Sequence, residues 1–336
     1  MTSRDETDRR LAVAPMMAWT DVHCRALHRS LAPHARLYTE MVSTGALLNG
    51  PRDRLLQCPA DQHPLALQLG GSCPDALAAC CDLAARAGFD EINLNLGCPS
   101  DRVQEARFGA CLMTEPARVA ECVRAMTRAS DVPVTVKCRL GVDDHDSYAF
   151  LKHFVDAVAE AGARTVIVHA RKAWLTGLTP AQNRSIPPLD YERVYRLKAA
   201  RPSLSIVLNG GLADLPTIVA HAERLDGVMI GRAAYHDPWL LARADAALFG
   251  TRLPLSRGAA LAPILRYVDA HLANGGRLHD VTRHLHGYFN GCPGARRFRR
   301  HLATHALRPG AGRSVLEDAI SLVSEVAEPE ARCSSG

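Results

Sequence analysis

Residues 91–100 have the sequence EINLNLGCPS, in which the spacing of a β-strand runs directly into a polar turn. Apolar side chains at 92, 94 and 96 alternate with asparagines at 93 and 95, and this period of two is typical of a strand. Gly97 and Pro99 then end the strand and hold Cys98 between them. A lone cysteine in a tight turn is more often structural than functional. Buried asparagines are costly unless hydrogen-bonded, however, so two of them leading into Cys98 indicate a polar site.

Short apolar runs of the same kind recur along the first two thirds of the chain. Alanine-rich helical patterns lie between several of them, at 74–88, 116–129, 147–162 and 189–200. Such alternation predicts parallel strands joined by right-handed crossovers. Eight units in roughly 230 residues predict an α/β fold, a closed (β/α)8 TIM barrel; an open doubly wound sheet is the alternative, but no GxGxxG motif follows the first run. The eight runs span 11–16, 37–42, 64–69, 91–96, 133–140, 165–170, 205–209 and 227–230.

The strand pattern ends after Pro238 and Trp239, and the rest of the chain shows helical patterns. We expect helices at 258–274, 278–289, 294–305 and 314–326, joined by glycine-rich connections. The sequence therefore predicts a barrel followed by a C-terminal helical domain. The expected boundaries are a flexible N-terminal tail at 1–10, the barrel at 11–245, the helical domain at 250–326 and a flexible tail at 327–336.

Positive charge is concentrated in the predicted helical domain. Residues 250–313 hold 11 arginines and only two acidic residues, Asp269 and Asp280, whereas residues 1–249 carry no net charge. Codon bias explains the preference for arginine over lysine, but it does not explain the scarcity of acids. Because the arginine guanidinium forms forked contacts with phosphate, this segment is suited to a polyanion.

The overall composition is that of an ordinary globular protein, with 336 residues, 47% hydrophobic and 22% charged. No apolar run approaches the roughly 20 residues that span a membrane, and residues 1–10 are too polar for a signal peptide. The 11 cysteines show no paired spacing, which argues against a disulfide framework or a zinc site. Free thiols suit a reducing compartment. We expect a cytoplasmic protein that binds neither membrane nor metal.

Polar residues and glycines follow the predicted strands at their carboxyl ends, which line the active face of a TIM barrel. Glycines after the last two strands allow backbone N–H groups to approach a phosphate. Gln68 offers both a donor and an acceptor to the edge of a heterocycle, and Lys137 supplies the cation that a reduced flavin requires. The strand-end residues are Pro15, Met16, Met17, Gln68, Asn95, Cys98, Lys137, Arg139, His169, Arg171, Asn209, Gly210, Gly211, Gly231 and Arg232.

Several of these residues fall in segments that resemble the tRNA-dihydrouridine synthases, most closely the DusA subfamily. LNLGCPS (94–100) and HARKAWLTGL (169–178) are specific to the resemblance, whereas LNGG (208–211) is common to many flavin barrels. The resemblance runs from about residue 11 to about residue 310. Further matching segments are APMMAWTD (14–21), LYTEMVSTGALL (37–48), LQLGGS (67–72), VKCRLGVDD (136–144) and GVMIGRAAYHDPW (227–239).

The resemblance implies a barrel that binds FMN and a helical domain that grips tRNA. In the family, NADPH or NADH reduces FMN, and reduced FMN passes hydride to C6 of a uridine at position 20 or 20a of the D-loop. The cysteine of the GCPS motif, here Cys98, donates a proton to C5. Carried over by motif, the FMN contacts are Pro15, Met16, Met17, Gln68, Lys137, His169, Asn209, Gly210, Gly211, Gly231 and Arg232.

The resemblance also implies which residues contact RNA. Asn95 would touch the target uridine, and Arg184, Arg297 and Arg300 would contact the tRNA. Ala181 stands where relatives often carry a longer polar side chain, so one RNA contact would be missing here. A uridine inside a folded RNA must be turned out to reach a pocket, which accounts for a basic domain beside the barrel mouth. We expect the protein to be a monomer.

The residues suit this chemistry independently of the resemblance. Reducing the 5,6 double bond of uracil requires a hydride on one carbon and a proton on the other, and a cysteine thiol is mostly protonated at neutral pH. Two alternatives remain. A flavin barrel that reduces a free pyrimidine or an enone has no use for the arginine-rich domain. A non-catalytic RNA-binding protein has no need for Cys98, Lys137 and His169.

Overall fold

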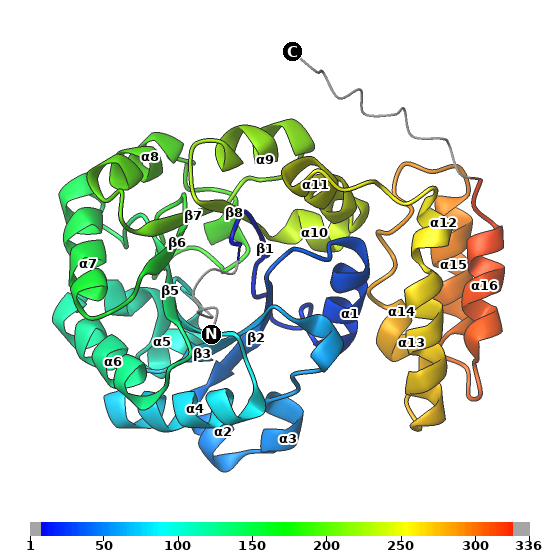
Figure 1. Ribbon diagram of the computed structural model, residues 1–336, viewed down its shortest axis with the longest axis horizontal. Helices are drawn as coiled ribbons and strands as arrows, with labels where there is room; N and C mark the ends of the chain where they lie inside the picture. The colour runs from blue at the N-terminus through cyan, green and yellow to red at the C-terminus, as the bar shows by residue number, and fades with distance from the viewer. Residues whose placement is uncertain (1–7, 325–336) are drawn as a thin grey trace.

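The computed structural model describes residues 8–324, and its strands form a closed parallel barrel (Figure 1). The strand order is β1-β8-β7-β6-β5-β4-β3-β2. A parallel bridge between Ala12 and Arg36 joins β1 to β2 and closes the ring. The predicted (β/α)8 TIM barrel is confirmed. The strands are β1 (Leu11–Val13), β2 (Leu37–Ser43), β3 (Leu65–Gly70), β4 (Glu91–Leu96), β5 (Val134–Arg139), β6 (Thr165–His169), β7 (Ser205–Asn209) and β8 (Gly227–Ile230).

Helices cover the outside of the barrel. The four predicted barrel helices correspond to α4, α6, α7 and α8, and Pro74 and Pro116 occupy the first turns of α4 and α6. The remaining helices of this layer were not predicted. Most of them are short, but α1 (Val22–Leu31) and α11 (Trp239–Phe249) have 10 and 11 residues and were missed although they are long enough to show a helical period. The layer consists of α1 (Val22–Leu31), α2 (Thr44–Asn49), α3 (Arg52–Leu55), α4 (Pro74–Ala87), α5 (Asp101–Glu105), α6 (Pro116–Ala129), α7 (Tyr148–Glu160), α8 (Tyr191–Ala200), α9 (Leu215–Ala222), α10 (Arg232–His236) and α11 (Trp239–Phe249).

The alternation in β4 divides its side chains between two environments. Ile92, Leu94 and Leu96 are fully buried in the core between strands and helices. Glu91 and Asn93 are also fully buried, but they lie inside the barrel and hydrogen-bond to side chains of neighbouring strands. The barrel interior is therefore partly polar, and the asparagine period seen in the sequence is the inward-facing side of this strand.

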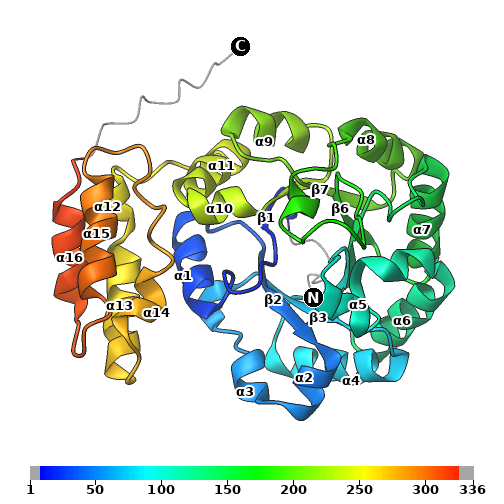
Figure 2. The same cartoon turned by 180° about the vertical axis from the view of Figure 1, so that it is seen from behind.

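A helical bundle lies beside the barrel, next to α1, α10 and α11 (Figures 1 and 2). Its core is a second hydrophobic cluster that includes Tyr288, Phe289 and Phe298. Trp239 at the start of α11 belongs to the same cluster, so the two parts of the chain share buried surface. The helices are α12 (Arg257–Ala260), α13 (Ala262–Ala273), α14 (Leu278–Thr282), α15 (Ala295–His305) and α16 (Arg313–Ser321).

The helix predicted at 278–289 is wrong in its second half, because α14 ends at Thr282. The following segment packs its backbone against the end of α10. A Cβ atom on Gly287 would lie only 2.1 Å from the carbonyl oxygen of His236, and Asn290 Nδ2 donates to the same oxygen at 2.6 Å. This contact between distant segments overrides the local helical pattern.

The described residues overlap only one of the two predicted flexible tails, the one at 1–10. Arg9 and Arg10 fall within the predicted tail 1–10, yet Arg9 pairs with Glu91 and Arg10 donates to the carbonyl of Leu248. Residues 1–7 and the predicted tail 327–336 lie outside the described residues. No helix within 8–324 is long and apolar enough to cross a membrane.

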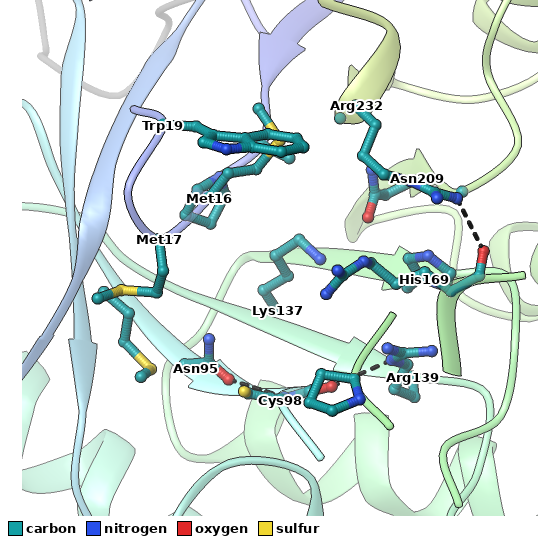
Figure 3. A pocket seen from close by; sticks show the side chains of 18 of the residues that line it. Met16, Met17, Trp19, Asn95, Cys98, Lys137, Arg139, His169, Asn209 and Arg232 are labelled. Carbon is teal, nitrogen blue, oxygen red and sulfur yellow. Dashed lines mark hydrogen bonds between the residues drawn. The ribbon is translucent and has the colours of Figure 1, made fainter. Parts of the chain in front are cut away.

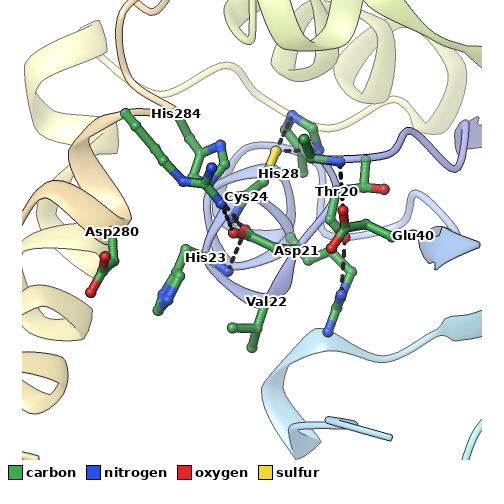
Figure 4. Close-up of polar contacts among 12 residues, drawn as sticks. Thr20, Asp21, Val22, His23, Cys24, His28, Glu40, Asp280 and His284 are labelled. Carbon is green, nitrogen blue, oxygen red and sulfur yellow. Dashed lines mark hydrogen bonds and ion pairs between the residues drawn. The ribbon is translucent and has the colours of Figure 1, made fainter. Parts of the chain in front are cut away.

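Asp21 joins the barrel to the helical bundle (Figure 4). Its carboxylate caps α1 by accepting from the backbone N–H groups of His23 and Cys24 at 3.0 and 2.9 Å. From the bundle, Arg283 pairs with one carboxylate oxygen, and His284 Nε2 lies 3.0 Å from the other. Burial alone would raise the pKa of Asp21, but His284, the Cys24 N–H and Arg283 together lower this pKa overall.

Candidate active site

A cavity of about 680 Å³ opens at the carboxyl ends of the barrel strands (Figure 3). All eleven residues predicted to contact FMN line it, and so do Asn95, Cys98 and Arg184. Arg297 and Arg300 do not. They line a separate hollow of about 300 Å³ on α15, together with His301, Thr304 and His305. The structure therefore brings together the predicted cofactor and uridine contacts, and places the other two predicted RNA contacts on the helical bundle.

Cys98 is held by the turn that follows β4. Asn95 Oδ1 accepts from the backbone N–H groups of Gly97 and Cys98 at 3.1 and 3.0 Å. The carbonyl of Cys98 accepts from Ala110 N at 2.9 Å. The Cys98 thiol lines the cavity, and its Sγ lies 3.4 Å from the Ser100 hydroxyl. The thiol is thus placed at the cavity wall by a well-bonded turn, as the sequence predicted for this position.

The glycine pair after β7 is required by its surroundings. Gly210 and Gly211 have φ angles of 105° and 75°, which side chains disfavour. A Cβ atom on Gly211 would lie 2.3 Å from the Tyr191 hydroxyl, and one on Gly210 would lie 3.1 Å from the His169 ring. Arg232, from the neighbouring strand end, is held by a 3.1 Å hydrogen bond from its Nη2 to the Arg184 carbonyl. Exposed backbone and a fixed guanidinium suit a phosphate.

The cavity has a one-sided charge distribution. Lys137, Arg139, Arg184 and Arg232 line it, and no carboxylate does among the described residues. Burial, and then the charge of Arg139, lower the pKa of Lys137 to about 7. Burial also lowers the pKa of Arg139 to about 10. These depressed values show cations that lack anionic partners, and an anionic ligand would stabilise their charged forms.

His169 lies at the end of β6 and is nearly buried, with 8% of its surface exposed. Burial, followed by the charges of Arg139 and Lys137, lowers its pKa well below the usual value, so the imidazole is neutral at physiological pH. Its Nδ1 atom has no hydrogen-bond partner among the described residues. A buried ring nitrogen without a partner is unusual in a folded protein, and a polar ligand in the cavity would satisfy it.

The cavity also contains residues that the sequence did not assign to the site. Trp19 lines its edge and stacks on Tyr235 at 4.4 Å with ring planes 9° apart. Arg139 was recognised as a strand-end residue, but its role was not. Its Nε donates to the carbonyl of Gly97 at 3.0 Å, and its Nη1 donates to the carbonyl of Asn183 at 2.9 Å. It therefore ties the Cys98 turn to the loop that carries Arg184.

Ala181 is exposed beside Arg184, at the start of the short 3-10 helix η4 (Gln182–Arg184). Its methyl group offers no hydrogen bond. That the short side chain of Ala181 removes an RNA contact stays a prediction. The prediction came from the resemblance, because relatives often carry a longer polar side chain at this position.

Comparison with known proteins identifies the family. A family model described as Dihydrouridine synthase (Dus) matches residues 12–324. A tRNA-dihydrouridine(20/20a) synthase of Xanthomonas axonopodis pv. citri is 56% identical over 319 residues, which is 95% of this chain and 95% of the relative. Proteins of the same name from Shewanella oneidensis and Pseudomonas putida are 54% and 53% identical, over 92% and 96% of this chain and the same shares of their own. The chain therefore belongs to the dihydrouridine synthase family, as its motifs predicted.

Proposed function

We propose that the protein reduces uridines of tRNA to 5,6-dihydrouridine, with bound FMN and with NADPH or NADH as the reductant. The targets proposed are positions 20 and 20a, which the names of the relatives specify. One observation carries the proposal most directly. The Cys98 thiol, the Lys137 amine and the glycine cradle at Gly210 and Gly211 open onto the same cavity, whose lining holds cations and no carboxylate among the described residues.

The residues present fit FMN. Gly210, Gly211 and Arg232 would hold its phosphate, because two bare backbone positions and a fixed guanidinium face the cavity together. The Nδ1 of His169, which has no hydrogen-bond partner within residues 8–324, and the amine of Lys137 would meet polar atoms of the cofactor. Pro15, Met16, Met17, Gln68, Asn209 and Gly231 complete the predicted contacts. When bound, FMN supplies the hydride for the reduction.

The protein's own groups would supply the proton and the orientation. Cys98 would act as the general acid toward C5, because its thiol lies at the wall and its backbone is fixed by Asn95. The Ser100 hydroxyl, 3.4 Å from the thiol, would return a proton to it. Asn95 would contact the uracil. The uridine would leave its stack to enter the cavity, which excludes bulk water from the reaction.

The helical bundle would hold the rest of the tRNA. Arg297 and Arg300 are exposed on α15 and line the same hollow, and Arg184 lines the cavity of the barrel. Phosphate contacts of this kind supply most of the affinity of a protein for nucleic acid. A reductase of free pyrimidines or enones would need the cavity but would gain nothing from this surface.

The test is to compare tRNA from cells with and without the gene and then to assay the purified protein. We expect a yellow protein that forms dihydrouridine at position 20 or 20a and that acts poorly on free uridine. Cys98→Ala should keep its flavin and lose activity by roughly 10²- to 10⁴-fold. A colourless protein that takes up no FMN would contradict the cofactor. Equal activity on free uridine would favour the small-molecule alternative.

A further inference from the structure

A chain of buried hydrogen bonds runs from the cavity into the interior of the barrel. Asn95 Nδ2 donates to Gln68 Oε1, and Gln68 Nε2 donates to Asn93 Oδ1, both at 2.8 Å. Asn93 Nδ2 then donates to Thr135 Oγ1 at 2.8 Å, and the Thr135 hydroxyl donates to Glu91 Oε1 at 2.6 Å. Gln68, Asn93, Thr135 and Glu91 are at most 1% exposed. Each hydrogen bond of the chain is therefore donated by the residue nearer the cavity to the residue nearer Glu91.

The direction of the chain is fixed at its inner end by charge. Burial alone would raise the pKa of Glu91, but Arg9 and Arg36 outweigh burial and lower this pKa overall. Arg9 pairs with the carboxylate, and Arg36 Nη1 lies 3.5 Å from it. An ionised carboxylate only accepts hydrogen bonds. The Thr135 hydroxyl must therefore donate to Glu91, which leaves its oxygen free to accept from Asn93.

The direction is fixed at the outer end by the backbone. The N–H groups of Gly97 and Cys98 both require an acceptor, and Asn95 Oδ1 is that acceptor. The amide nitrogen of Asn95 must then point the other way, toward Gln68. Figure 3 shows this orientation, with the Asn95 oxygen toward Cys98 and its nitrogen toward the side of the cavity where Lys137 lies. The backbone at the outer end and the Glu91 carboxylate at the inner end require the same direction of hydrogen bonding. No amide in the chain can therefore turn over without losing hydrogen bonds on both of its sides.

The polarity decides what the cavity wall offers a ligand. An amide nitrogen has two hydrogens, and one hydrogen of Gln68 and one of Asn95 are used within the chain. Both side chains line the cavity. The second N–H of each amide is not used within the chain and is available to a ligand in the cavity, so both side chains act as donors there. The sequence alone left Gln68 able to present either a donor or an acceptor.

We propose that Asn93 is a positioning residue for base selection. With Thr135 and Glu91 behind it, Asn93 fixes the Gln68 amide, whose oxygen in turn holds the amide nitrogen of Asn95. The second N–H of Asn95 is then the donor that favours uracil over cytosine, while Gln68 remains a predicted contact of FMN. Uracil has a carbonyl acceptor at its 4-position, where cytosine has an amino donor. A donor facing a donor leaves both groups unpaired in a closed site. The inference rests on the proposed function, because it concerns the base that enters the same cavity.

The test compares two replacements of Asn93. Asn93→Leu is similar in size but removes the acceptor for Gln68, so the Gln68 amide can turn over. The amide nitrogen of Asn95 then loses its acceptor, although the Asn95 oxygen stays bonded to the backbone. Asn93→Asp keeps this acceptor, and when protonated it also keeps the donor to Thr135. Tyr38→Phe is the matched control, because it removes another buried hydrogen bond to Glu91 Oε1, of 2.5 Å, outside the chain.

Each variant is assayed with tRNA carrying uridine at the target position, in competition with the same tRNA carrying cytidine there. We expect Asn93→Leu to reduce the preference for the uridine-containing tRNA by about tenfold, and Asn93→Asp and Tyr38→Phe to stay within about twofold. The inference fails if Asn93→Leu keeps the preference, or if Asn93→Asp loses it equally. If the leucine variant does not fold, Asn93→Ala removes the same acceptor.

Flavin content and NAD(P)H oxidation without RNA are measured for every variant, to show that the barrel and the cofactor site are intact. A wild-type protein that makes no dihydrouridine would overturn the proposed function. Normal wild-type activity with unchanged preference in Asn93→Leu would overturn only the role of Asn93.

Discussion

Lys137 shows how the barrel sets the charge of a single side chain. It lies at the cavity wall beside Arg139, with no carboxylate in the lining among the described residues. Burial and Arg139 lower its pKa to about 7, whereas an unfolded chain keeps a lysine pKa near 10.4. The unfolded state therefore binds this proton more tightly. Burial of Lys137 therefore lowers the free energy of unfolding below about pH 7, and this loss declines as the pH rises from about 7 to about 10.

Replacing Lys137 should consequently stabilise the flavin-free protein while it abolishes the reaction. We expect Lys137→Met to raise the free energy of unfolding by on the order of 1–3 kcal/mol at pH 6, and to lose this advantage near pH 10. Urea unfolding of the flavin-free protein at the two pH values measures the difference. Lys152→Met, at a partly exposed ion pair with Asp156, is the control and should bring no gain. A gain that is independent of pH would contradict the argument.

Asn93 and Arg139 mark the limit of what the sequence predicts at single residues. The positions of Cys98 and Lys137 follow from strand periodicity, because the carboxyl ends of parallel strands meet at one edge of the barrel. The partners of Asn93 lie 25 and 42 residues away in the chain. Those of Arg139 lie 42 and 44 residues away. Such contacts depend on strand register, which no local pattern specifies.

Among the elements, the strands were predicted best. Five of the eight runs have their observed carboxyl end at the predicted residue or one residue beyond it, because each stops at a glycine or a polar cluster. The helices α2 and α10 are only 6 and 5 residues long and contain fewer than two helical turns, too few for a periodic pattern to show. The helix expected at 278–289 failed because Gly287 packs against α10, which is a tertiary contact. Periodicity predicts helices and strands that have one apolar face, and it misses elements whose length is set by a tertiary contact with another segment.

The loop at 171–190 is an irregular element whose shape depends on Asn183. This side chain is fully buried. Its Oδ1 accepts from Trp174 N at 2.7 Å, and its Nδ2 donates to Trp174 O at 2.9 Å. Its own carbonyl accepts from Arg139. A single amide thus closes the loop that presents Arg184 to the cavity.

Asn183→Ala should loosen this loop without disturbing the barrel. The lost hydrogen bonds leave backbone groups of Trp174 without partners, at a cost of roughly 1–3 kcal/mol. We expect faster hydrogen exchange at the Trp174 amide, about tenfold weaker tRNA binding and unchanged flavin content. Ser185→Ala removes only an exposed hydroxyl of the same loop and serves as the control. Unchanged exchange at Trp174 in the Asn183 variant would show that the loop is held by other contacts.

On the scale of the whole molecule, Asp21 fixes the helical bundle against the barrel. Its pKa is lowered in the folded protein, so its contribution to stability is present above the unfolded pKa near 3.9. The contribution is lost as the pH falls through the lower, folded value. Asp21→Asn keeps an oxygen for the α1 cap but removes the charge that meets Arg283 and His284.

We expect Asp21→Asn to destabilise the protein by about 1–3 kcal/mol at pH 7, and the difference from wild type to shrink in strong acid. Thermal unfolding as a function of pH measures this effect. Asp82→Asn is the control, because Asp82 pairs with Arg86 on the surface of α4, and exposed pairs contribute little. If the two variants lose the same stability, the ion pairs of Asp21 contribute no more to folding than an exposed ion pair does.

The charge distribution of the molecule predicts how binding to tRNA responds to salt. Residues 250–313 hold 11 arginines and two acidic residues, and Arg297 and Arg300 line a hollow on α15. Each phosphate neutralised by an arginine releases counterions, so the logarithm of the binding constant should fall linearly with the logarithm of the salt concentration. Arg297→Gln and Arg300→Gln should each weaken binding at low salt and reduce this slope by roughly one.

Arg313→Gln is the matched control for these two variants. It removes the same charge from the same bundle, but Arg313 is already paired with Asp269 and Glu317, so its guanidinium has little charge left for phosphate. The slope should therefore stay within the error of the wild-type value. If all three variants change the slope equally, the bundle attracts tRNA only through its total charge. If none does, tRNA is held by other residues.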